Sequence, residues 1–89
     1  MKDLFEVEKI IRKLYKEKLG KNADQISVHE WDFDNKSYVV HIMGRDHEPQ
    51  LRTEIKEKDI EDYLGKVRAE TNIVNSLQNF KSLSSLFLL

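Results

Sequence analysis

The 89-residue chain has no cysteine, one proline and three glycines. Without cysteine there is no disulfide, no thiolate metal site and no cysteine nucleophile, which argues against a small secreted domain held by disulfides. Three glycines also provide neither a glycine-rich phosphate loop nor a Gly-x-Ser-x-Gly nucleophile elbow. No apolar run reaches the ~20 residues of a bilayer span, and the charged N-terminal turns do not fit a signal peptide. We therefore expect a cytoplasmic protein with no membrane partner.

The chain also lacks a large excess of charge of either sign, because it contains 15 basic and 16 acidic residues. Such a balance creates no strong global field that would attract nucleic acid or an anionic membrane. Hydrophobic residues make up 39% of the chain and fall in regular patterns, which predicts a folded protein. The length predicts a single domain over residues 1–89, small enough that self-association would help to stabilise it.

The first predicted element is a helix over residues 3–19. Asp3 fits an N-cap, Glu6 has the spacing of a capping box, and Gly20 can end the helix in the left-handed conformation. Its apolar stripe at helical spacing consists of Leu4, Val7, Ile11 and Leu14.

Residues 25–33 and 38–44 are rich in β-branched and aromatic side chains and predict a β-hairpin. A two-residue loop at Asn35 and Lys36 gathers most of the large apolar groups on one face. That register pairs Phe33 with Tyr38, Trp31 with Val40, and His29 with Ile42.

A third strand is expected over residues 50–57, followed by a helix over 59–71 with Asp59 as N-cap. One straight helix continuing from residue 59 would carry apolar groups on two opposite sides. We favour a break near residues 71–72 and a second helix over 73–87. The expected fold class is α+β, a two-layer α-β-β-β-α-α arrangement with a three-stranded antiparallel meander packed on helices.

The predicted hairpin brings together groups that can bind a metal or exchange protons. In the chosen register Glu30 lies across from His41, and Asp32 follows on the same face. These three residues are the candidate ligands of a metal-dependent or acid–base enzyme. A solvated strand face with opposite charges across the strands explains the same residues, and we favour it. No catalytic residue and no cofactor are therefore predicted.

The order helix, three strands, helix resembles that of the double-stranded-RNA-binding domain over residues 3–71. The resemblance implies a lysine cluster at the start of the second helix, where this chain has Asp59, Glu61 and Asp62. These carboxylates would repel phosphates. A weaker nucleic-acid candidate is the basic side of the first helix, made of Lys9, Arg12, Lys13 and Lys16, although lysines on a helix face are usually solvated.

Two features favour protein binding. Trp31, Phe33 and Tyr38 bring aromatic groups together on the hairpin, where they serve either as core or as interface anchors. The second feature is an apolar C-terminal stretch that must be buried in its own fold or in a partner. Its candidate interaction residues are Leu83, Leu86, Phe87, Leu88 and Leu89.

The favoured hypothesis is therefore a small non-enzymatic interaction protein, such as an inhibitor, adaptor or assembly factor. We expect it to bind another protein, to form a homodimer, or both. Its composition is also compatible with an origin in a phage or mobile element.

Overall fold

The first helix, α1 (Leu4–Leu19), forms as its terminal residues predict. The computed structural model describes residues 2–66 and 69–83. The Asp3 carboxylate accepts a hydrogen bond from the backbone N–H of Phe5 at 2.8 Å, so the predicted N-cap is confirmed. Gly20 ends the helix in the left-handed region, with φ 63°.

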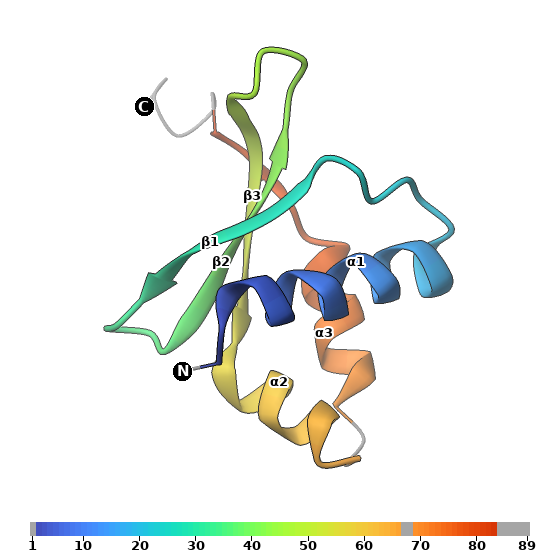
Figure 1. The fold of residues 1–89 in the computed structure, drawn as a ribbon, viewed down its shortest axis with the longest axis vertical. Coiled ribbons are helices and arrows are strands. Elements are labelled where there is room, and N and C mark those ends of the chain that lie inside the picture. Colours follow the sequence, from blue (N-terminus) through green and yellow to red (C-terminus); the bar gives the residue numbers. More distant parts are fainter. Residues whose placement is uncertain (1, 67–68, 84–89) are drawn as a thin grey trace.

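Within residues 2–66 and 69–83 the sheet contains four antiparallel strands in the order β1-β2-β3-β4 (Figure 1). The predicted meander is present as β1 (Ile26–Asp32), β2 (Ser37–Met43) and β3 (Pro49–Lys56). A short strand that was not predicted, β4 (Lys81–Ser82), pairs with the start of β3. The α+β fold class is thus confirmed, with one additional edge strand.

The predicted hairpin register is wrong by two residues next to the turn and by three residues beyond the bulge in β1. Trp31 pairs with Tyr38 and Asp32 with Ser37, so the connection is a four-residue turn over residues 33–36. A β-bulge between Val28 and Glu30 then changes the alternation of β1. The bulge puts Val28 and Trp31 on the same face although they are three residues apart.

The C-terminal half also departs from the predicted bounds. Helix α2 (Glu57–Leu64) follows β3 directly, so Lys56, and not Asp59, is its N-cap. The predicted break between two helices exists, but it precedes α3 (Glu70–Leu77) and does not lie at residues 71–72. The predicted helix over 73–87 is interrupted after α3, because residues 78–82 are not helical and include β4, while residues 84–87 of that prediction lie outside the described residues.

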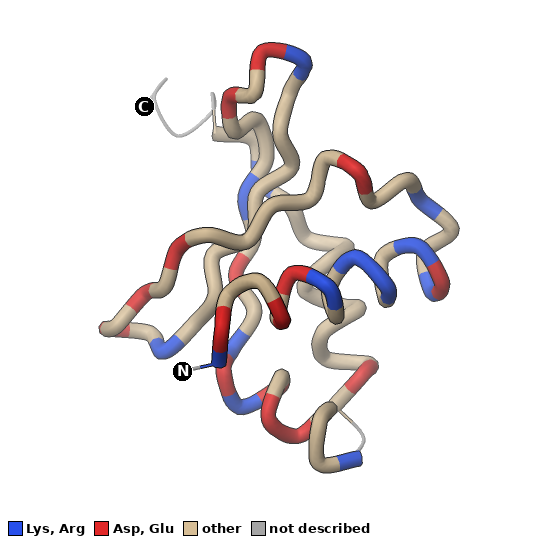
Figure 2. Tube along the Cα trace, viewed as in Figure 1, with Lys and Arg blue, Asp and Glu red and all other residues tan. Residues whose placement is uncertain are grey.

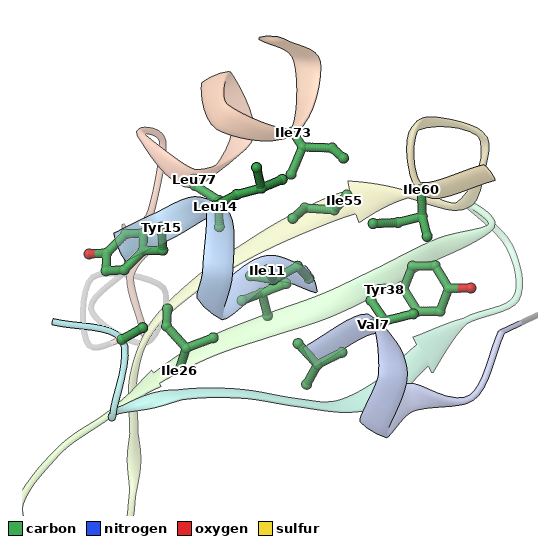
Figure 3. Close-up of a cluster of buried hydrophobic side chains, with 13 residues drawn as sticks. Val7, Ile11, Leu14, Tyr15, Ile26, Tyr38, Ile55, Ile60, Ile73 and Leu77 are labelled. Carbon is green, nitrogen blue, oxygen red and sulfur yellow. The ribbon is translucent and has the colours of Figure 1, made fainter. Parts of the chain in front are cut away.

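The three helices α1, α2 and α3 all pack on one face of the sheet (Figures 1 and 3). This is the core face, because Tyr38, Val40 and Ile55 point from it into the buried cluster. From the helices the cluster includes Val7, Ile11, Leu14, Tyr15, Ile60, Ile73 and Leu77. Alternation along β2 assigns Val39 and His41 to the opposite face, which we call the outer face.

Candidate functional site

Three side chains with metal-ligand chemistry converge on the outer face. His29, Glu30 and His41 each offer one ligand atom, and these atoms all lie within 4.8 Å of one another. Consecutive residues of a regular strand point to opposite faces, so His29 and Glu30 would normally diverge. The bulge in β1 removes that constraint and turns both toward His41 on β2.

His41 is the buried member of this cluster, with 6% of its surface exposed. Its Nδ1 atom has no hydrogen-bond partner among the described residues. Burial lowers the pKa of His41 below its usual range, although the charge of Glu30 acts in the opposite direction. Leaving a buried polar atom unpaired costs about 1–3 kcal/mol, so His41 contributes to the fold less than an apolar residue would.

His29 is exposed, and its orientation is set by a neighbour on the same strand. The hydroxyl of Ser27 lies 2.7 Å from Nδ1 of His29. If Nδ1 carries the proton and donates to that hydroxyl, Nε2 keeps its lone pair for a ligand. The imidazole rings of His29 and His41 meet edge to face with centroids 5.6 Å apart.

Asp32, the third predicted ligand, does not belong to this cluster. Its carboxylate accepts hydrogen bonds from the backbone N–H groups of Asp34 and Asn35, and from the Asn35 side chain at 2.8 Å. The bonds from Asn35 hold the pKa of Asp32 below its usual value. Asp32 thus stabilises the hairpin turn. Although Glu30 pairs with Val39 and not with His41, the cluster still unites Glu30 and His41, and His29 takes the place predicted for Asp32.

The three hairpin aromatics have different environments. Tyr38 is fully buried in the core, where its hydroxyl accepts a hydrogen bond from the backbone N–H of Lys2 at 2.8 Å. Trp31 is partly buried, with its ring centroid 4.9 Å from that of Tyr38. Phe33 is 81% exposed in the turn and meets Trp31 edge to face at 6.2 Å. Phe33 is therefore the member of this set that a partner can reach.

The basic side of α1 includes one residue with a structural role that the sequence did not reveal. Arg12 donates two hydrogen bonds, at 2.8 and 3.1 Å, to the carbonyl of Ile26 on the edge strand β1. Glu8, one turn earlier, accepts a hydrogen bond from the backbone N–H of Val28 at 2.9 Å. This Glu8–Arg12 clamp satisfies edge groups that would otherwise be free to pair with another strand.

Nucleic-acid binding by the other cations of α1 stays a prediction. Lys13 and Lys16 are exposed, while the Lys9 ammonium lies 4.8 Å from the ring centroid of Phe5. Figure 2 shows basic segments along α1 and acidic ones along α2, where the resemblance to the RNA-binding domain required lysines.

The C-terminal candidates are mostly outside the described residues. Leu83 is partly buried, and Leu86, Phe87, Leu88 and Leu89 lie beyond the part of the chain that the structure describes. A polar groove is present between the hairpin turn and the helices α2 and α3. Its lining of carboxylates, amides and lysines differs from the mostly apolar lining of small-molecule sites.

Comparison with protein-family models, curated proteins and solved structures finds no match for this chain. Across residues 2–66 and 69–83, none of the helices combines the length and the apolar character that crossing a membrane requires. The features of this molecule that bear on function are therefore the geometry of the hairpin and of the outer face.

Proposed function

We propose that this chain is a non-enzymatic protein-interaction domain that anchors itself in a partner protein through Phe33. The observation that carries the proposal is the exposure of Phe33, 81% in a turn where polar residues are the rule. Burying a phenylalanine side chain gains roughly 1.5–3 kcal/mol, which the isolated fold leaves unused. Aromatic anchors of this kind dominate the binding energy of many protein interfaces.

The turn that carries Phe33 is preorganised for binding. Asp32 holds the backbone of the turn through Asp34 and Asn35, and the Trp31 ring supports Phe33 from the core side. Because the anchor is ordered before binding, less conformational entropy is lost when the partner docks.

The geometry also favours one mode of contact. The Glu8–Arg12 clamp occupies backbone groups of Ile26 and Val28 on the edge strand. Addition of a partner strand there would first have to displace two side chains. We therefore propose that the partner binds side chains at the hairpin turn and does not add a strand beside β1.

Photo-crosslinking in the cells of origin tests this proposal. Benzoylphenylalanine replaces Phe33 in one variant and Phe5 in a matched control, since Phe5 is a second exposed phenylalanine at 63%. We expect position 33 to give one dominant crosslinked species and position 5 to give none above background. A crosslink to another copy identifies a homodimer, and a crosslink to a different chain identifies an adaptor or inhibitor.

The Phe33→Ala variant provides the corresponding loss-of-function measurement. This variant should no longer co-purify with the partner that crosslinking identifies. Its free energy of unfolding should stay within about 0.5 kcal/mol of that of the unsubstituted chain, as is usual for surface substitutions. Equal crosslinking from both positions, or undiminished partner capture by Phe33→Ala, would overturn the proposal.

A further inference from the structure

We propose that His29, Glu30 and His41 form a binding site for a divalent first-row metal ion of the Zn²⁺ class. The three ligand atoms lie within 4.8 Å of one another on the outer face. The site is separate from the Phe33 anchor, and the two proposals can fail independently.

His41 is the fixed ligand of this site. It is 94% buried, and its Nδ1 atom has no hydrogen-bond partner in the described part of the chain. Buried polar groups in folded proteins are nearly always satisfied, so an exception calls for a specific cause. Coordination by a metal ion uses a ring nitrogen of a neutral histidine, and it would give this buried ring the polar partner that it lacks among the described residues.

His29 and Glu30 are exposed and able to close around an ion. Zinc bonds of about 2.0–2.2 Å in a tetrahedral arrangement bring ligand atoms to roughly 3.3 Å from one another. The observed separations therefore need a contraction, which two solvent-exposed side chains can supply by rotamer changes. The hydroxyl of Ser27 beside Nδ1 of His29 supplies the outer hydrogen bond that metal-binding histidines usually have.

The chemistry of the ligands selects the class of ion. Two imidazole nitrogens and one carboxylate oxygen suit zinc and its first-row neighbours, whereas calcium and magnesium prefer oxygen ligands throughout. Three protein ligands leave the fourth tetrahedral position for water or for a group from a bound molecule. The nearby positive charge of Arg52, which pairs with His41 across the strands, is offset by Glu54 at 3.3 Å.

Calorimetric titration of the chelator-treated full chain with Zn²⁺ tests the proposal. We expect saturable binding of one ion per chain, and ligand-field bands of tetrahedral Co²⁺ when cobalt replaces zinc. His29→Ala and Glu30→Gln should each weaken zinc binding at least about tenfold, since even outer-shell changes cost 10–100-fold. Both positions are exposed, so far-UV circular dichroism should remain that of the unsubstituted chain.

His47→Ala is the matched control, because His47 is an exposed histidine in the β2–β3 loop outside the cluster. It should bind zinc as tightly as the unsubstituted chain. The proposal is overturned by an absence of saturable one-to-one binding, by full affinity in His29→Ala and Glu30→Gln, or by loss of binding in His47→Ala.

Discussion

Both faces of the sheet contain buried side chains, but burial has different consequences on each face. On the core face, Tyr38 and Ile55 are 0% exposed beneath the helices. On the outer face, Val39 and His41 are 3% and 6% exposed, although α1, α2 and α3 all pack on the other side. Burial on the core face stabilises the fold, whereas burial of His41 fixes a polar group that the fold does not need. Function is therefore to be sought on the outer face and at the turn.

The largest effect is expected on the core face. Ile55→Ala should lower the free energy of unfolding by about 2–5 kcal/mol, because it removes buried methyl groups and leaves a cavity. Lys56→Ala, at the exposed neighbouring position, should change it by no more than about 0.5 kcal/mol. Urea denaturation measures both. Similar costs for the two variants would break the distinction between the faces.

An intermediate effect is expected where α1 protects the edge strand. The double variant Glu8→Ala plus Arg12→Ala frees the carbonyl of Ile26 and the N–H of Val28. Hydrogen bonds to charged groups are worth about 1.5–3 kcal/mol each. Because this clamp is partly exposed to solvent, we expect the double variant to lower the free energy of unfolding by about 1.5 kcal/mol in total. Light scattering should also show concentration-dependent association through the freed edge.

Lys13→Ala is the control for that experiment, since Lys13 is an exposed cation on the same helix. It should leave both stability and association unchanged. If the double variant behaved like this control, the clamp would have no protective role.

The smallest effect concerns pH and the turn. The pKa of Asp32 is lowered in the fold, so its ionised form contributes stability that is present above the unfolded pKa of about 3.9. That contribution disappears as the pH falls through the folded pKa. Thermal melts from about pH 6 to about pH 2.5 cover the unfolded pKa and the values below it. Over this range Asp32→Asn should lose less thermal stability than the unsubstituted chain does. Identical acid profiles would show that Asp32 does not stabilise the turn through its charge.

The sequence predicts elements well where both of their ends carry local signals. Asp3 and Gly20 define α1 because capping depends on a few adjacent residues. The start of α2 was missed because β3 leads directly into it, and Lys56 makes no side-chain cap within the described structure. The register failed because the turn at residues 33–36 is held by local hydrogen bonds to Asp32, and because a bulge at His29 shifts the pairing. Neither feature is visible in the alternation of polar and apolar residues.

The candidate site was predicted only in part, because the predicted faces of β1 depended on the wrong register. The sequence predicts that Glu30 and His41 lie close together on neighbouring strands. They do lie close together, although the predicted register is wrong. Asp32 was named because alternation put it on the same face, whereas the turn recruits its carboxylate. The convergence of His29 with Glu30 had no sequence signal, since adjacent strand residues normally diverge.

The most direct test of the central claim is the stability of His41→Phe with chelator and with zinc. Phenylalanine replaces the imidazole with an apolar aromatic ring and removes the unpaired nitrogen, so in chelator the variant should be at least as stable as the unsubstituted chain. Zinc at about 100 times its Kd should then raise the stability of the unsubstituted chain by about 2.7 kcal/mol and leave the variant unchanged. Two results together would contradict the account. One is a variant that, in chelator, is destabilised by more than about 1 kcal/mol, which is a typical net contribution of one hydrogen bond. The other is an unsubstituted chain that gains no stability from zinc.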